Sequence, residues 1–458
     1  MSLKIYNPSN NELIKEIPTD NSETLAHKYE LLKNGVQEFQ KTSVRDRILM
    51  MSKFSDLLRK NKEHLARVLS DEMGKPYSEA LGEVKGAAVK IQFFLQESEK
   101  YLTKKKVNHD GGTEEFISYE PLGIIANISA WNYPYLVGVN IFVPALICGN
   151  GVFYKPSEYS TLTGIEIEKL LFQAGFPPEV FKLAIGGAEV GEELLNMPLD
   201  GYFFTGSYKT GKHIATKVAP KLVPVGLELG GKDPLYVTNK VSSIKDVAAS
   251  AVSGAFYNNG QSCCSVERIY VHDEVYDEFL EEFLKEVENL KVGNPFDKNI
   301  TQGAISRKEH LSFLEEQVSD ALSKGAKLET GGKVISGPGN FFEPTVFTNV
   351  NHEMRIMTEE TFGPIIGIQR VTNDDEALVH MNDTDYGLTA SVFTSEKGRA
   401  EKLMKKLDAG TCYLNCCDRV SGYTPWAGRK NSGLGATLSF HGLYVFTKTK
   451  AWHFRQNM

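Results

Sequence analysis

The alternation of strand-like and helical segments constrains this chain most. From about residue 121, short apolar runs typical of buried strands alternate with stretches of helical spacing. The runs are residues 123–128, 151–155, 180–185 and 202–205. Between two of them, Ile165, Leu170 and Leu171 predict a helix over residues 162–175. Strands that alternate with helices form βαβ units around a parallel sheet, which binds ligands at the carboxyl ends of its strands.

A second series of the same kind begins after Asp233. Residues 268–272 are typical of a strand, and residues 274–290 form an amphipathic helical pattern with Phe279 and Phe283 on one stripe. A chain of 458 residues is long for a single hydrophobic core. We therefore expect two α/β domains. Because no Pro/Gly/Ser-rich linker separates them, the active site should lie between them.

The charge pattern indicates no nucleic-acid partner. The formal net charge is −7, and acidic and basic residues are mixed along the chain. Residues 1–8 lack the apolar core of a secretory signal, so we expect a cytoplasmic protein. Residues 135–153 carry no charge, but Asn140 and Pro144 favour a buried helix followed by a strand over a membrane span.

One cysteine pair is a candidate nucleophile. The six cysteines include two adjacent pairs and no C-x-x-C spacing, which indicates reduced thiols and no metal site. Cys263 and Cys264 follow Asn259-Gly260-Gln261-Ser262, in a turn after the helical run 247–257. A nucleophilic thiol needs access and a stabilised thiolate, and the backbone N–H groups of a turn can supply both. Composition alone, however, favours two small buried cysteines.

Two further residues have types suited to catalysis. Glu228 lies between Leu227 and Leu229 just before a double glycine, where desolvation would raise the pKa of a general base. The alternative is a glutamate on the polar face of an edge strand. Asn132 follows the first predicted strand and could aim its amide at a developing oxyanion, although an asparagine in a turn before proline is common.

Two segments are candidates for cofactor binding. Lys155 ends a predicted strand, and Glu158 follows it, so both could reach a ribose. Residues 204–211 run from a strand into a helix, whose N-terminus could face a pyrophosphate. This second segment is not G-x-G-x-x-G, and by itself it is a weak motif.

Taken together, these elements resemble the aldehyde dehydrogenase superfamily. The resemblance rests on their order and spacing, together with residues 359–364 and 425–433, and it covers essentially the whole chain. It implies an α/β fold with three parts. The expected parts are a Rossmann-type cofactor domain (1–105 and 121–231), an α/β catalytic domain (232–435) and a small β oligomerisation element (106–120 and 436–458). In the last of these, residues 116–119 and 443–452 are predicted to be strands. It also implies a homodimer or homotetramer.

The resemblance implies a reaction in which an aldehyde becomes a carboxylic acid. Cys263 corresponds to the nucleophile, which forms a thiohemiacetal and then a thioester. Asn132 and the backbone N–H of Cys263 correspond to the oxyanion hole. Glu228 corresponds to the base that activates water to hydrolyse the thioester. Acylating members of the superfamily lack that glutamate, so a free acid is the expected product.

The resemblance also assigns residues to the cofactor. Glu360 and Phe362 correspond to positions that hold the nicotinamide ribose and ring. A carboxylate at Glu158 would bond the adenosine ribose and repel a 2′-phosphate, so NAD is favoured, with NADP use left open. The full set expected to bind cofactor is Trp131, Lys155, Glu158, Gly206, Ser207, Gly211, Glu360 and Phe362.

The chain departs from the common pattern in places that leave the substrate open. Trp426 and Ala427 stand where Phe and Gly are more usual, and Ile141 stands where some relatives have a lysine proposed to relay protons. The residues expected to line the substrate tunnel are Tyr133, Val137, Asn140, Ser262, Cys264 and the loop 419–426. Tyr133 and Trp426 would suit an apolar or aromatic aldehyde or a cation, and Arg419 an acidic tail.

Two other hypotheses remain at this stage. A thiol hydrolase could use Cys263 and Glu228 without hydride transfer, which would leave the cofactor segments unexplained. A non-catalytic protein on the same fold is the other. The presence of Cys263, Glu228 and Asn132 argues against it.

Overall fold

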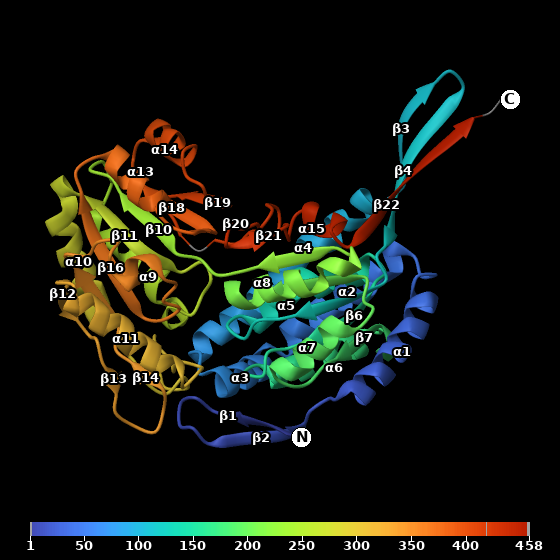
Figure 1. Cartoon of the computed structure of the whole chain (residues 1–458), viewed down its shortest axis with the longest axis horizontal. Coiled ribbons are helices and arrows are strands. Elements are labelled where there is room, and N and C mark those ends of the chain that lie inside the picture. Colours follow the sequence, from blue (N-terminus) through green and yellow to red (C-terminus); the bar gives the residue numbers. More distant parts are fainter. Residues whose placement is uncertain (1, 418, 456–458) are drawn as a thin grey trace.

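Two largely parallel sheets organise the molecule in the computed structural model, which describes residues 2–417 and 419–455 (Figure 1). The first sheet has the order β21-β9-β8-β5-β6-β7, in which only the short β21 is antiparallel to its neighbour. The sheet consists of β5 (Ile124–Ile128), β6 (Gly151–Lys155), β7 (Phe181–Leu183), β8 (Gly201–Thr205), β9 (Val225–Glu228) and β21 (Gly433–Leu434). In chain order, the five parallel strands follow the Rossmann arrangement 3-2-1-4-5, which places a topological switch point between β5 and β8.

Helices from the N-terminal part of the chain and from the crossovers cover this sheet. They are α1 (Ser22–Phe39), α2 (Val44–Lys60), α3 (Lys62–Met73), α4 (Tyr77–Leu102), α5 (Pro134–Ile147), α6 (Thr161–Gln173), α7 (Ala188–Asn196) and α8 (Tyr208–Val218). The uncharged stretch 135–153 forms the buried α5 and then enters β6, as predicted. The predicted helix 162–175 is α6, which ends two residues before Gly175. None of the described helices is long and apolar enough to cross a bilayer.

The second sheet has the order β12-β15-β16-β11-β10-β18-β19, and β12 alone is antiparallel to its neighbour. Its strands are β10 (Asp233–Val237), β11 (Val266–His272), β12 (Lys327–Thr330), β15 (Thr345–Thr348), β16 (Ile365–Val371), β18 (Thr389–Phe393) and β19 (Thr411–Leu414). The helices of this part are α9 (Ile244–Phe256), α10 (Tyr276–Glu288), α11 (His310–Ser323), α12 (Arg355–Thr358), α13 (Asp374–Asn382) and α14 (Lys397–Met404). The predicted second α/β unit is therefore present.

Short two-stranded pairings lie beside the large sheets. They are β1 (Ser2–Tyr6) with β2 (Leu13–Pro18), β13 (Val334–Ile335) with β14 (Phe341–Phe342), and β17 (Tyr386–Gly387) with β20 (Arg429–Lys430). Since β20 and β21 belong to one segment but pair with β17 and β9 respectively, residues 429–434 cross from the second unit to the first sheet. This crossing brings the C-terminal part of the chain back to the carboxyl end of β9.

A third, antiparallel sheet projects from the body as an arm (Figure 1). It consists of β3 (Lys105–Asp110), β4 (Thr113–Pro121) and β22 (Thr447–Arg455). The strand predicted for residues 443–452 is wrong at its start, because Leu443 lies in the short helix α15 (His441–Tyr444). Leu443 and Phe446, three residues apart, are both fully buried in the core of the first unit, which a strand would not allow.

Candidate active site

The carboxyl ends of the strands in the first sheet bring the predicted polar side chains to one edge. Asn132 follows β5, Lys155 ends β6, Ser207 follows β8, and Glu228 ends β9. The N–H of Gly206 donates to the carbonyl oxygen of Glu228 at 3.0 Å, which ties the ends of β8 and β9 together. This is the edge at which a doubly wound sheet binds its ligands.

The turn that carries Cys263 is built on three consecutive residues with left-handed backbone. After α9 ends, Asn258, Asn259 and Gly260 have φ of 50°, 56° and 67°. Asparagine and glycine tolerate this region better than other residues. The side chains of Asn258 and Gln261 hold the turn closed, because each donates to the backbone carbonyl of the other at 3.1 Å. Cys263 is thus presented by a fixed turn, and it is partly exposed.

Gly260 provides a test of this turn. A Cβ at this position would lie 2.3 Å from the carbonyl oxygen of Gly363, and φ is left-handed. We expect Gly260→Ala to destabilise the protein by at least about 1–2 kcal/mol from backbone strain alone. Thermal unfolding should show a lower midpoint. Gly398→Ala is the matched control, because Gly398 lies in α14 with open space around it. An unchanged midpoint for Gly260→Ala would contradict this account of the turn.

Asn132 lies against this turn. Its side chain is buried, and its amide Nδ2 donates to the carbonyl oxygen of Gln261 at 3.0 Å. An amide nitrogen carries two hydrogens, so one remains for a ligand. Within the described chain, the backbone N–H of Cys263 donates no hydrogen bond. Asn132 therefore contacts the turn that carries Cys263, and both its amide and the backbone of Cys263 keep an N–H that a ligand could use.

A buried ion pair that the sequence analysis missed supports Asn132. Lys75 Nζ lies 2.5 Å from Glu83 Oε2 and donates to the carbonyl oxygen of Asn132 at 2.8 Å. Glu83 Oε1 accepts from the backbone N–H of Tyr135 at 2.9 Å. The same ammonium lies 3.5 Å from the centroid of the Tyr133 ring. The pair thus fixes the segment between β5 and α5, and breaking a buried pair of this kind is costly.

Glu228 lies in a desolvated position. Its carboxylate accepts hydrogen bonds from Thr205 Oγ1, at 3.3 Å, and from Thr437 Oγ1. Burial raises the pKa of Glu228, and the hydrogen bond from Thr437 opposes part of that increase. The residue borders a cavity of about 260 Å³, which also touches Ile141 and Trp426, so it is partly exposed although protein surrounds its carboxylate. The predicted rise in pKa is confirmed. β9 is not an edge strand, because β21 lies beside it.

Glu360 and Phe362 approach the same region from the second unit. The N–H of Gly231 donates to Glu360 Oε1 at 3.1 Å, and burial raises the pKa of Glu360 to about 8. The Trp131 and Phe362 rings meet in a T-shaped arrangement, with ring centroids 5.5 Å apart. Residues from both units therefore face one another beside the double glycine, as the sequence predicts for a site between two domains.

The segment containing Glu360 and Phe362 is held by Glu267, a second residue that the sequence analysis missed. Glu267 accepts from the backbone N–H of Thr361 at 2.9 Å and of Phe362 at 3.0 Å. Lys232 Nζ completes the arrangement at 2.6 Å from the Glu267 carboxylate. Both side chains are almost fully buried. This support explains how Phe362 is kept at a φ of 49°, a region that phenylalanine rarely adopts.

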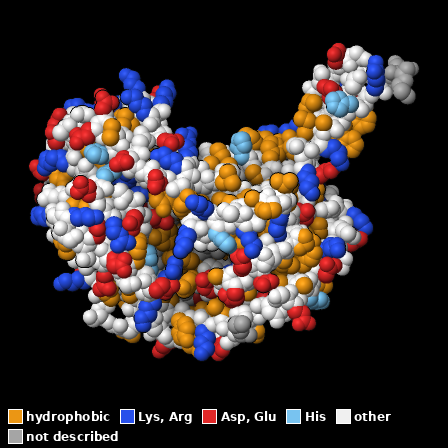
Figure 2. Space-filling model, viewed as in Figure 1, with side chains coloured by type: hydrophobic (Ala, Val, Ile, Leu, Met, Phe, Trp, Pro, Cys, Tyr) orange, Lys and Arg blue, Asp and Glu red, His pale blue; other side chains and the backbone are white. Residues whose placement is uncertain are grey.

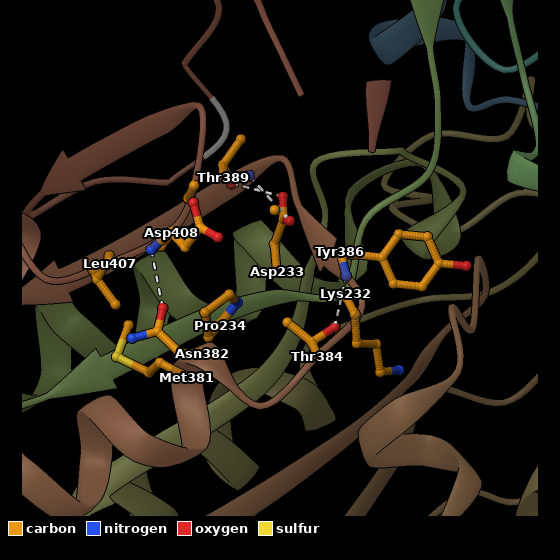
Figure 3. A pocket seen from close by; sticks show the side chains of 13 residues that line it. Lys232, Asp233, Pro234, Met381, Asn382, Thr384, Tyr386, Thr389, Leu407 and Asp408 are labelled. Atoms are coloured by element: carbon orange, nitrogen blue, oxygen red, sulfur yellow. Dashed lines mark hydrogen bonds between the residues drawn. The ribbon is translucent and has the colours of Figure 1, made fainter. Parts of the chain in front are cut away.

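A small pocket close to Lys232 is not part of this site (Figure 3). Its volume is about 10 Å³, enough for about one water molecule. Asp233 lines it and accepts from the N–H and Oγ1 of Thr389 at 3.1 and 2.7 Å. The Lys232 ammonium binds the carboxylate of Glu267, which does not line the pocket. The Cys263 turn contributes none of its lining residues, so we regard the pocket as a structural feature.

The whole chain matches a known family of enzymes. The sequence model of the aldehyde dehydrogenase family matches residues 1–452. The chain belongs to the aldehyde dehydrogenase family. Betaine aldehyde dehydrogenase of Beta vulgaris is 32% identical over 98% of this chain and 92% of its own length. Betaine aldehyde dehydrogenase of Bacillus subtilis is 33% identical over 97% of this chain and 92% of its own length.

Solved structures give the same result. A betaine aldehyde dehydrogenase from Staphylococcus aureus in complex with NAD⁺ has a TM-score of 0.96 and 30% identity, over 100% of this chain and 95% of that one. An NADP-dependent enzyme of Escherichia coli also has a TM-score of 0.96, with 28% identity over 99% of this chain and 95% of that one. The predicted fold, the family and an NAD(P)-dependent dehydrogenase of aldehydes are thereby confirmed.

In this aldehyde dehydrogenase, the residues at the ends of β6 and β8 fit a dinucleotide. Lys155 is buried, and the only polar contact recorded for its ammonium in the described chain is the carbonyl oxygen of Pro156 at 3.4 Å. Burial lowers the pKa of Lys155, while the negative charge of Glu158 favours its charged form. A buried ammonium ordinarily has a strong partner, and ribose hydroxyls would supply one. Glu158 is half-buried next to it.

The end of β8 fits the pyrophosphate. Ser207 caps α8 by accepting from the backbone N–H of Thr210 at 3.4 Å, so the helix N-terminus opens at the edge of the sheet. A Cβ on Gly206 would lie 2.4 Å from the Phe204 ring, and one on Gly211 would lie 2.5 Å from Leu229. Gly211 therefore lets α8 approach the end of β9 closely, and Gly206 leaves room for the Phe204 ring in the turn between β8 and α8.

Proposed function

We propose that this aldehyde dehydrogenase converts an aldehyde to a carboxylic acid through a thioester on Cys263. The convergence of Cys263, Asn132 and Glu228 at one edge of the first sheet carries the proposal. The Cys263 thiolate adds to the aldehyde carbon and forms a thiohemiacetal. The negative charge on its oxygen is stabilised by the N–H of Cys263 and the amide of Asn132.

A nicotinamide dinucleotide held among Trp131, Glu360 and Phe362 would supply the acceptor for the hydride of the thiohemiacetal carbon. Glu228 then takes a proton from a water molecule that attacks the thioester, and the acid leaves with release of the Cys263 thiol. A carboxylate whose pKa is raised by burial is a stronger base than an exposed one, which suits it to this step. The cavity beside Glu228 gives water a place to reside.

The residues that would hold the cofactor are those predicted from the sequence. Lys155 and Glu158 would bond the adenosine ribose, while Gly206, Ser207 and Gly211 would form the pyrophosphate site. The nicotinamide end would lie among Trp131, Glu360 and Phe362. The buried Lys155 ammonium, whose one hydrogen bond in the described chain is long, and the close packing of α8 support this assignment.

Absorbance measurements at the near-ultraviolet band of NADH test the function. Wild-type protein should form NADH from NAD⁺ and at least one member of a panel of aldehydes. The rival hypothesis of a thiol hydrolase predicts cleavage of thioesters with no NADH from any aldehyde. That hypothesis leaves the site at Lys155 and the Trp131–Phe362 contact without a role.

We further propose that Glu158 makes NAD the preferred cofactor. Its carboxylate would accept hydrogen bonds from the ribose hydroxyls and repel a 2′-phosphate. Glu158→Ser should therefore raise the ratio of kcat/KM for NADP⁺ over NAD⁺ by about tenfold or more, since removing one repulsion of this kind is worth at least ~1.4 kcal/mol. A half-buried carboxylate in the same unit provides the control, Glu193→Ser. An unchanged ratio in Glu158→Ser would refute the assignment.

The projecting arm is proposed as the oligomerisation element, with the two α/β units as cofactor-binding and catalytic domains. Residues 106–120 and the strand from Thr447 onward form the arm, while residues 436–446 belong with the first core. Phe454 and Val107 are exposed on the arm, and Figure 2 shows hydrophobic side chains gathered along it. Exposed edges of this kind are usually covered, so we propose a homodimer or homotetramer.

The compartment is proposed to be the cytoplasm. All six cysteines are free thiols in the structure, which fits a reducing environment. The names of some relatives give other compartments, such as the chloroplastic enzyme of Beta vulgaris and a peroxisomal aminoaldehyde dehydrogenase of Pisum sativum. Charges of both signs are interspersed on the face shown in Figure 2, which supports the absence of a nucleic-acid partner.

A further inference from the structure

Buried lysines are the feature that points beyond the proposed reaction. Among the described residues, four lysines are almost fully buried: Lys75, Lys90, Lys155 and Lys232. Two of them have a carboxylate partner, at 2.5 Å for Lys75 and 2.6 Å for Lys232. In the described chain, Lys90 and Lys155 have no carboxylate oxygen within 4.0 Å. Lys155 faces the proposed cofactor site, which leaves Lys90 without an assigned partner.

Lys90 lies on α4, toward the reactive thiol. It is 9% exposed, and the only hydrogen bond recorded for its Nζ goes to the carbonyl oxygen of Leu136 on α5, at 3.4 Å. The ammonium interacts electrostatically with Glu228 and Cys263, and also with Cys264 and Glu83. Burial lowers its pKa, and these neighbours oppose the change. An ammonium held this way is poorly compensated for its loss of water.

The surroundings of Lys90 are those predicted for the substrate tunnel. The backbone of Lys90 borders the loop 419–426, because its carbonyl oxygen lies 3.4 Å from the position of a Cβ on Gly422. One turn further, Phe93 meets Tyr423 of that loop edge-on at 5.2 Å. Asn140 Oδ1, on the α5 side, is buried and has no hydrogen-bond partner in the described chain. Lys90 and Asn140 therefore offer buried polar groups near Glu228, because both act on the pKa of that carboxylate.

We infer that Lys90 binds a carboxylate at the far end of the aldehyde substrate, so that the enzyme oxidises semialdehydes of dicarboxylic acids. This inference rests on the proposed function, because Cys263 must hold the aldehyde carbon while Lys90 holds the acid. A charge-assisted hydrogen bond from the ammonium to the carboxylate would satisfy the buried charge. The negative substrate would in turn favour the charged form of Lys90.

The same charge acts against cationic aldehydes. The relatives named above include betaine aldehyde dehydrogenases, whose named substrate carries a quaternary ammonium. In this chain, a cation in the tunnel would meet the Lys90 ammonium in a desolvated space, where like charges repel strongly. The Tyr133 ring already has the Lys75 ammonium on one face, so a second cation there is also unfavourable. The chain is therefore expected to differ from these relatives in substrate charge.

The experiment compares aldehydes of similar length and different charge. Initial rates of NADH formation are measured with 4-oxobutanoate, its methyl ester and 4-trimethylammoniobutanal, with 3-oxopropanoate and 5-oxopentanoate added to vary length. Wild-type protein should prefer an anionic member. In Lys90→Met, kcat/KM for that member should fall about 10- to 100-fold while the methyl ester loses less than about threefold. Lys85→Met, an exposed lysine on the same helix, should leave both unchanged.

The outcomes separate this inference from the proposed function. If wild type oxidises neutral or cationic aldehydes at least as well as every anionic one, the role of Lys90 in recognition is wrong while the reaction stands. An equal loss of kcat/KM for all substrates in Lys90→Met would also overturn it. That pattern would mean that Lys90 acts on Cys263 or Glu228 and does not recognise the substrate. If wild type forms NADH from none of the aldehydes, the proposed function itself fails. Circular dichroism and thermal unfolding of each variant confirm that it is folded.

Discussion

Cys263→Ala should lose at least about a thousandfold of the NADH-forming activity with any aldehyde. Without the thiolate, no adduct forms from which a hydride can leave, and removing a nucleophile typically costs rate on this scale. The fixed turn of Asn258, Asn259 and Gly260 should keep its conformation, because alanine at position 263 adds no bulk. The measurement is the steady-state rate of NADH formation with saturating NAD⁺.

Cys264→Ala is the matched control for this prediction. Cys264 is the adjacent cysteine, but it is buried in the first core, whereas Cys263 is partly exposed. We expect Cys264→Ala to keep most of the activity. Full activity in Cys263→Ala would exclude covalent catalysis by this thiol. Loss of activity only in Cys264→Ala would assign the nucleophile to Cys264.

Glu228→Gln should separate the two halves of the reaction. Because the thiohemiacetal and the thioester form before water is needed, the variant should still release a burst of NADH equivalent to the active sites. Steady-state turnover should then fall about 10²- to 10⁴-fold, the usual contribution of a general base. Stopped-flow absorbance measures both phases. A variant with neither burst nor turnover would show that Glu228 acts before the thioester.

The pH dependence of wild type should agree with this role. Only the deprotonated form of Glu228 can take a proton from water, and burial raises its pKa. Turnover should therefore increase with pH through a pKa above the ordinary range of a glutamate. Glu168→Gln is the control, because burial also raises the pKa of Glu168, which lies on α6 and binds the backbone N–H of Leu183. It should change neither burst nor turnover, and a similar loss there would contradict the specific role of Glu228.

The sequence was sufficient for most strands of the first sheet and for the polar residues at their carboxyl ends, but for only one strand of the second sheet. Buried parallel strands consist of short apolar runs, so β5, β6 and β8 stand out, and polar residues that follow them gather at one edge. The start predicted for the strand at Leu443 is wrong. Leu443 lies in a helical turn, and both Leu443 and Phe446 are fully buried in that conformation. A short apolar run does not distinguish these two conformations.

The supporting charges could not be found from the sequence. Lys75, Glu83 and Glu267 are ordinary residue types in a chain of mixed charge, and only the tertiary structure shows that each is buried and paired. The same holds for Lys90, whose position on α4 follows no motif. A lysine that is buried without a counter-ion can be identified only when the positions of all neighbouring side chains are known. The determinants of substrate choice are therefore less accessible to sequence reasoning than the catalytic residues.

The most direct test of the central claim is the mass of the enzyme during the reaction. Glu228→Gln is mixed with NAD⁺ and a good aldehyde substrate, quenched in acid after the burst, and analysed intact and after proteolysis. The account predicts a mass increase equal to one acyl group, located at Cys263 by fragmentation and absent from the Cys263→Ala/Glu228→Gln double variant. An NADH burst without an adduct, or an adduct at Cys264, would contradict it.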